Sequence, residues 1–291
     1  MRNTSPYGLS HAPGQLDLHV SVPDSNAHVF GVDLTHIIHT NEVEAAKGGG
    51  HGGGGGGGGG GTTYPSYTSG SSDGSGFNIT INFNGTFSQQ NHDYFVAAAD
   101  QLTAIIAGDL PNVSVRSRGT VTNVDDIVIT AELGAIDGSG GILGQAGPTS
   151  LRTGSYLPAT ATMQFDIADV TDLGTAFADV VLHEMSHSLG FGSIWDRLGL
   201  VTNGEFTGAN ALQQYHDVMH QTGNIPVEQD GGSGTAGSHW DEETFGNELM
   251  TGYLNDGANY FTGMSAASFA DLGYQLHSDY LQHVDQGYIF V

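Results

Sequence analysis

The chain has 291 residues, and its 31 acidic side chains outnumber 6 Lys and Arg, which gives a formal net charge of −25. This imbalance argues against a nucleic-acid-binding protein, because phosphate contacts need clustered Lys and Arg. The absence of Cys excludes disulfides, thiolate catalysis and Cys-ligated zinc. No apolar run approaches the roughly 18–20 residues of a membrane-spanning helix. The composition favours an acidic, salt-tolerant or cation-binding protein that acts outside the cell.

Residues 1–47 form a polar leader of unknown role. Apolar and polar residues alternate over 16–20 and in part over 29–38, which indicates a short strand or two. The chain does not start with a charged segment followed by an apolar one, so we expect no Sec signal peptide.

Glycine dominates the next segment. Residues 48–61 contain 13 Gly, interrupted only by His51, and a run rich in Ser, Gly, Thr and Tyr continues to about residue 75. Such a composition cannot form a core, so we expect a flexible linker over 48–75. One catalytic-sized domain is expected over 76–291.

Within this domain, two kinds of apolar spacing alternate along the first half. Period-two alternation is typical of half-buried strands, and spacing by three and four residues is typical of helices. Regular patterning weakens after Gly192 and returns only at 266–272. The sequence therefore predicts an α+β domain with a loop-rich second half. Strands are expected at 77–83, 124–136 and 161–167, a short apolar stretch at 142–148, and helices at 94–106 and around 177–181.

The strongest chemical signal is the run His183-Glu184-Met185-Ser186-His187. On a helix the two His, four residues apart, project from one face and can bind the same zinc ion. Glu184 can then take a proton from a zinc-bound water, whose pKa the metal lowers toward roughly 7. From composition alone this pattern is expected roughly 0.02 times in such a chain, so it is a specific signal. Gly190 is placed to end the helix.

A catalytic zinc needs a third protein ligand and an open fourth position. The residues alone leave several alternatives for it. His239 lies in an irregular region, His216 and His220 form a second pair four residues apart, and Glu248 is a carboxylate candidate. The pair is more simply interpreted as surface residues of an expected helix.

Residues 238–252, SHWDEETFGNELMTG, resemble the third-ligand and Met-turn region of leishmanolysin-like metzincins. In the compact metzincin pattern a third His would stand at position 193, which is Ser193 here. Leishmanolysin-like members instead have a long insertion before the third His. The resemblance therefore implies His239 as third ligand and Met250 as the Met-turn residue beneath the metal.

Two further segments carry the resemblance. Residues 263–274 resemble the helix that closes such domains, and 142–148 resemble the edge strand above the cleft. An exposed edge there would bind substrate backbone as an extra antiparallel strand. The expected substrate-binding residues are Leu143, Gly144, Gln145 and Ala146.

The resemblance implies a metzincin fold over roughly 77–291. The upper part, about 76–190, would hold a twisted mixed sheet, a backing helix and the zinc helix. The lower part, about 191–291, would hold the third ligand, the Met-turn and a C-terminal helix. The implied activity is that of a zinc-dependent endopeptidase acting on peptides or proteins with one catalytic zinc. We expect a secreted monomer, and the lack of Cys suggests a bacterial version.

Other interpretations stay open. A non-catalytic secreted binding or adhesion module, stabilised by zinc or calcium, is the main alternative. Calcium has candidate loops at 137–141 and 230–232, but neither completes a known calcium motif, so turns are expected there. Tyr253 stands three residues after Met250, whereas the Tyr that assists catalysis in some metzincins stands two after, which favours a structural role.

Overall fold

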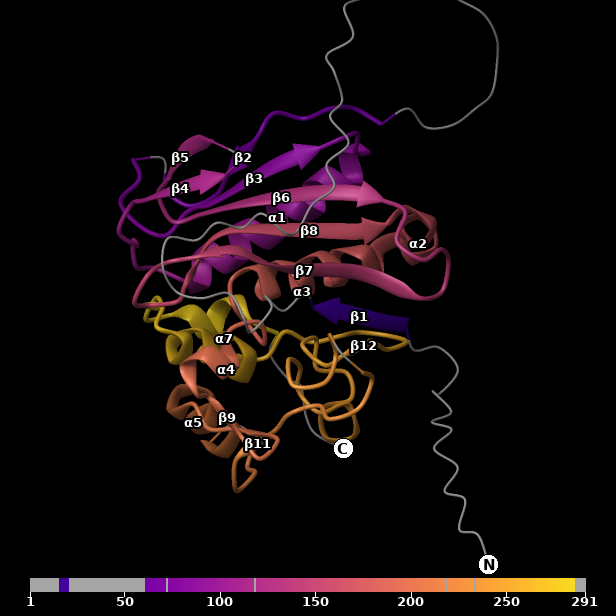
Figure 1. The fold of residues 1–291 in the computed structure, drawn as a ribbon. Coiled ribbons are helices and arrows are strands. Elements are labelled where there is room, and N and C mark those ends of the chain that lie inside the picture. Colours follow the sequence, from indigo (N-terminus) through magenta and orange to yellow (C-terminus); the bar gives the residue numbers. More distant parts are fainter. Residues whose placement is uncertain are drawn as a thin grey trace, which may run out of the picture.

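The computed structural model describes residues 16–20, 61–71, 73–117, 119–217, 219–232 and 234–285. A seven-stranded sheet forms the upper part, and irregular chain with short helices forms the lower part (Figure 1). The sheet has the strand order β12-β1-β7-β8-β6-β3-β2. Its strands are β1 (Leu16–Val20), β2 (Tyr67–Thr68), β3 (Ile79–Asn84), β6 (Ile127–Gly134), β7 (Ile142–Leu151), β8 (Pro158–Asp166) and β12 (Tyr253–Leu254).

Helices and smaller sheets complete the described chain. The helices are α1 (Gln89–Ile105), α2 (Ile167–Leu173), α3 (Phe177–Ser188), α4 (Trp195–Leu198), α5 (Ala209–Asp217), α6 (Glu242–Phe245) and α7 (Gly263–Leu272), with 3₁₀ turns η1 (Gly174–Ala176) and η2 (Tyr280–His283). A hairpin joins β4 (Val113–Ser117) to β5 (Thr120–Val124), and a small sheet contains β9 (Val201–Thr202), β10 (Glu205–Phe206) and β11 (Ile225–Pro226). None of the helices in the described ranges is long and apolar enough to span a membrane.

The large sheet is mixed. Strands β3, β6 and β8 run parallel, whereas β7 runs antiparallel to β8. The expected α+β architecture with a mixed sheet is therefore confirmed. One detail differs from expectation, because β7 is not an open edge: β1 pairs with it in parallel, and β12 pairs with β1. The pairing of β1 with residues more than 120 positions away has no local sequence signal.

Aromatic rings join the helices to the sheet. The rings of Phe95 on α1, Phe165 on β8 and Phe177 on α3 lie with their centroids 5.2–6.2 Å apart in edge-to-face arrangements, and all three are fully buried. Such pairs contribute about 0.5–1.5 kcal/mol each beyond their buried area. This cluster holds α3 against the sheet.

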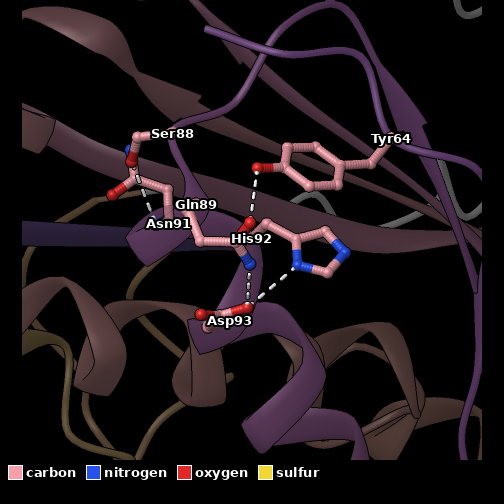
Figure 2. Close-up of polar contacts among 6 residues, drawn as sticks. All are labelled: Tyr64, Ser88, Gln89, Asn91, His92 and Asp93. Atoms are coloured by element: carbon pink, nitrogen blue, oxygen red, sulfur yellow. Dashed lines mark hydrogen bonds and ion pairs between the residues drawn. The ribbon is translucent and has the colours of Figure 1, made fainter. Parts of the chain in front are cut away.

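The first turn of α1 shows why the helix starts before the apolar spacing does. The Ser88 hydroxyl accepts the Asn91 N–H at 3.1 Å, which caps the helix (Figure 2). The Tyr64 hydroxyl donates to Gln89 Oε1 at 3.2 Å, and its ring stacks on His92 at a centroid distance of 4.0 Å. The chain before the helix is thereby fixed to it.

Tyr64 belongs to the range 48–75 expected to be a linker. In the structure, Thr62 bridges to Phe87, and β2 pairs with β3. The part of this range from Thr62 to Thr68 therefore packs against the domain, because Tyr64 and Tyr67 contact the core. Residues 48–60 and most of the leader 1–47 lie outside the described residues, so these domain limits stay a proposal.

A buried carboxylate stabilises the loop between β6 and β7. Asp166 at the end of β8 accepts the backbone N–H groups of Ile136, Asp137, Gly138 and Ala168 at 2.8–2.9 Å. These hydrogen bonds, that of Ala168 first, lower the pKa of Asp166 to about 2. The turn at 137–141 is thus held by carboxylate-to-backbone hydrogen bonds.

Replacing this carboxylate should loosen the loop. We expect Asp166→Ala to lower the melting temperature, because four N–H groups lose their acceptor. Asp172→Ala, at an exposed position of α2, is the matched control and should melt like the wild type. Equal melting temperatures of the two variants in thermal unfolding would contradict the role given to Asp166.

Candidate metal centre

Helix α3 brings the first three predicted site residues together. It packs against β7 and β8 and is buried on nearly all sides, which agrees with its apolar composition. His183, Glu184 and His187 are each 0% exposed. The i, i+4 spacing has the expected effect, since the Nε2 atoms of the two His lie 2.8 Å apart.

His239 joins this pair from the lower part of the chain. Its Nε2 lies 3.2 Å from that of His183 and 3.0 Å from that of His187. The loop around it is held by Glu228, whose N–H donates to the His239 carbonyl at 3.0 Å and whose carbonyl accepts the Gly237 N–H at 2.8 Å. The three imidazoles therefore meet at one buried point.

The opposite ring nitrogens determine the tautomers. Each Nδ1 lies within hydrogen-bond distance of a backbone carbonyl, and a carbonyl can only accept, so Nδ1 carries the proton and the Nε2 lone pair faces the other two rings. Burial first, and the neighbouring His239 second, hold the pKa of His183 well below its usual value. The pairs are His183 with Leu249 (2.7 Å), His187 with Phe191 (2.8 Å) and His239 with Thr235 (2.9 Å).

Three converging lone pairs repel one another unless a cation lies between them. Nitrogen atoms 2.8–3.2 Å apart can all lie within the roughly 2.0–2.1 Å bond length of one zinc ion. Zinc-ligating imidazoles are typically neutral, and their second ring nitrogen typically donates a hydrogen bond to a carbonyl or carboxylate oxygen, as in this site. The residues therefore fit a zinc ion.

In the described ranges, one further group of side chains lies close enough together to bind a metal, and it consists of carboxylates: Asp109, Asp125 and Asp126. Its buried member, Asp126, already accepts backbone N–H groups from Asn78 at 2.8 Å and Leu110 at 2.7 Å. The other two are exposed. This cluster has a structural explanation, and in the described ranges the candidate calcium loops 137–141 and 230–232 do not bring three possible metal ligands close together.

No hydrogen bond between described residues explains the burial of the Glu184 carboxylate. Both of its carboxylate oxygens are buried, and neither has a hydrogen-bond partner among the described residues. Burial raises its pKa well above the usual value. A Cβ at Gly144 of β7 would lie 3.0 Å from Cγ and Oε1 of Glu184, so the missing side chain at this position makes room for the carboxylate.

Two glycines shape the chain after α3. Gly190 has a φ of +110° and donates its N–H to the His187 carbonyl at 3.0 Å, so it ends the helix as expected. Gly192, with a φ of +67°, would place a Cβ only 2.0 Å from the Ser238 carbonyl oxygen. The backbone just before His239 is thus in direct contact with the turn after α3. This contact brings a segment that is distant in sequence to the metal centre.

The segment 248–250 contacts two of the ligand segments. The Leu249 carbonyl accepts from His183, and the Met250 carbonyl accepts the Trp240 N–H at 3.0 Å. Met250 is fully buried, and its N–H donates to Glu248 Oε2 at 2.5 Å.

Glu248, weighed from the sequence as a third ligand, fixes the segment instead of joining the His cluster. Its Oε1 accepts the Thr262 N–H, the Thr262 hydroxyl and the Ser265 hydroxyl. Burial raises the pKa of Glu248 to about 7, although these donors act in the opposite direction. The carboxylate therefore ties the segment 248–250 to α7.

The second His pair does not share a helix face. Helix α5 ends at Asp217, and His220 lies beyond it with a φ of +55°. His216 Nε2 lies 2.6 Å from the Gly223 carbonyl oxygen. Tyr253 is buried in β12, next to β1. Sequence reasoning missed Glu228 and Gly192, and no pattern in the sequence distinguishes them from other Glu and Gly residues.

Gly192→Ala should weaken zinc binding about tenfold or more, because the new Cβ would push the Ser238 backbone and with it His239. Gly199→Ala is the matched control: its φ is +66°, so it carries the same backbone strain, but nothing lies within 4 Å of its Cβ position. Zinc affinity is measured by competition with a chelator. Equal affinities in the two variants would contradict the packing argument.

Glu248→Gln should lower the free energy of unfolding by about 1–3 kcal/mol, because its amide would direct N–H groups at the Met250 N–H. Denaturant unfolding of the variant and the wild type at the same pH measures the loss. Glu243→Gln, at an exposed position of α6, should unfold like the wild type. A wild-type value for Glu248→Gln would mean that the carboxylate does not stabilise this segment.

Known proteins resemble part of this chain. A leishmanolysin homolog of Crithidia fasciculata is 28% identical over 173 residues, which cover 53% of this chain and 25% of that protein. Leishmanolysins of Leishmania chagasi and Leishmania tropica are 30% identical over 119 residues, which cover 33% of this chain and 18% and 16% of theirs. The chain thus corresponds to a quarter or less of the length of these relatives.

A sequence model of a whole family was also matched. The model described as leishmanolysin matches residues 120–282, a range that includes α3, His239 and α7. This range is more than half of the 291 residues. The chain therefore belongs to the leishmanolysin family.

Proposed function

We propose that this chain is a zinc-dependent endopeptidase of the metzincin type. The observation that carries the proposal is the meeting of three neutral imidazoles beside a buried carboxylate that has no partner in the described structure. His183, His187 and His239 are the proposed ligands, and Glu184 is the proposed general base. Membership of a family of zinc metallopeptidases supports this assignment.

The chemistry divides between the metal and the chain. When bound, zinc would polarise the scissile carbonyl and acidify a water molecule. Glu184 would take the proton of the attacking water on a carboxylate oxygen and pass it to the leaving amine. Burial alone raises the pKa of Glu184 well above its usual value, and a bound cation would act in the opposite direction and favour the carboxylate that accepts the proton. Since no described residue donates to it, the carboxylate is free for this exchange.

Other chain segments would support the reaction. Met250 is proposed as the Met-turn residue, since its segment contacts both ligand-bearing regions. Gly190 would act structurally by ending the zinc helix. The substrate backbone would pair with β7 at Leu143, Gly144, Gln145 and Ala146, in the place that β1 occupies in the structure.

A binding module with a purely structural zinc is the competing function. Such a site has no use for Glu184, and burying a carboxylate without a partner costs several kcal/mol. A fold that keeps Glu184 buried in spite of this cost favours a catalytic role for the carboxylate over a purely structural zinc site. Calcium would add stability only at a site that neither sequence nor structure defines.

The proposed setting follows from composition. A charge of −25 with few cations suits a monomer working outside the cell, and the absence of Cys suits a bacterial version that does not depend on disulfides. The substrates would be peptides or unfolded proteins, with no nucleic acid involved.

Glu184→Ala tests the base. We expect the variant to keep wild-type zinc content but to cleave fluorescein-labelled casein about 10²–10⁴-fold more slowly, because only the proton transfer is lost. Metal analysis and a cleavage assay measure the two quantities. Wild-type cleavage by the variant would refute the mechanism.

His239→Ala tests the third ligand. We expect it to lose both zinc and cleavage, since two imidazoles hold the ion poorly. His216→Ala is the matched control, because His216 is exposed and lies on α5, away from the described His cluster. Full zinc content in His239→Ala would exclude His239 as a ligand.

A further inference from the structure

The third imidazole of the metal centre differs from the other two in the chain that carries it. His183 and His187 lie on one continuous helix, α3, whereas His239 lies in irregular chain between β11 and α6. Until a cation binds, the three converging lone pairs repel one another, and the imidazole on the irregular chain is the one most easily displaced. A contact outside the centre is therefore needed to keep His239 in place.

The orientation of the His239 ring depends on a loop that is rich in glycine. The Thr235 carbonyl of this loop, 229–238, accepts the hydrogen bond from His239 Nδ1. Four residues of the loop are Gly with a positive φ. Such a loop has few side chains that can pack, and its backbone loses many conformations when it becomes ordered. Its closed form therefore depends on contacts with side chains beside it.

The Glu228 carboxylate joins the chain on both sides of His239. Its Oε1 accepts the Asp230 N–H at 2.8 Å, and its Oε2 accepts the Glu242 N–H at 3.1 Å. Asp230 lies near the start of the loop, and Glu242 is the first residue of α6, three positions after His239. The backbone hydrogen bonds of Glu228 to Gly237 and His239 add to these contacts. One residue thus holds the chain before and after the third imidazole.

This contact requires a carboxylate. Glu228 is 4% exposed, and in the described ranges it forms no ion pair with Lys, Arg or His. A buried charge is costly unless its oxygens accept hydrogen bonds, as both do here. An amide of the same shape would keep one acceptor and direct N–H groups at the other donor. Capping of α6 does not explain the contact, because the Asp241 side chain already accepts the Thr244 N–H at 2.9 Å.

We propose that Glu228 is the positioning residue of the third zinc ligand: its carboxylate closes the loop before His239 and so holds this imidazole opposite His183 and His187. The proposal rests on the zinc centre argued above. With the loop closed, the Thr235 carbonyl stays at Nδ1 of His239, and Nε2 stays directed at the other two rings. Without the carboxylate the loop opens, and the two imidazoles of α3 are left to hold the ion.

Glu228→Gln tests this role, because it keeps the shape of the side chain and removes one acceptor. We expect zinc affinity, measured by competition with a chelator, to fall about 10–100-fold. The visible absorption of the cobalt(II)-loaded protein reports ligand number and geometry, so its bands should change as well. Asp241→Asn is the matched control: it removes the same charge two positions from His239, at a carboxylate that caps α6, and should keep wild-type affinity and absorption. Wild-type affinity and absorption in Glu228→Gln would overturn the proposal.

Hydrogen exchange of the wild-type protein tests the same contact without any variant. The amides of Asp230 and Glu242 donate to the Glu228 carboxylate, so they should be protected from exchange before zinc is added. Protection that appears only after zinc is added would mean that the metal, and not Glu228, closes the loop. This result decides the proposal even if Glu228→Gln does not fold.

His239→Ala separates the positioning role from the zinc centre itself. Loss of zinc in His239→Ala, together with wild-type affinity in Glu228→Gln, would refute the role of Glu228 and leave the centre intact. Full zinc content in His239→Ala would refute the centre and the positioning role together.

Discussion

Three hydrogen bonds from imidazole Nδ1 atoms to backbone carbonyls govern the rest of this structure. The accepting carbonyls belong to three separate segments: the turn after α3, the segment before Met250 and the loop before His239. Each bond fixes a ring orientation and a tautomer, so the metal centre exists only if all three segments are in place. The sheet, the helix and the irregular lower part are therefore coupled through one point, and the bound cation would in turn stabilise them.

The electrostatics of the centre contrast with those of the surface. The chain carries a net charge of −25, yet the centre is built from neutral imidazoles and one buried carboxylate whose burial opposes ionisation. A divalent cation placed there would reverse that balance and favour the anionic Glu184. Metal affinity and the protonation of Glu184 are thus linked.

The residues differ in how far they were predictable. His183 and His187 could be placed from spacing alone, because a helix puts positions four apart on one face. His239 lies 52 positions after His187 in an irregular region, so it required the family resemblance. Gly192 acts through a contact that only three-dimensional structure reveals. The place of β1 depends on strand pairing between distant segments, which local apolar alternation does not encode.

The contact between Gly192 and the Ser238 carbonyl has a consequence for how this chain can vary. The chain between these two positions therefore forms a long loop whose two ends are in contact near the metal centre. Lengthening such a loop costs little, about 0.6 kcal/mol of closure entropy for each doubling of its length. Descendants of this chain can therefore gain residues in this loop, and with them new surfaces, while the third imidazole stays where it is.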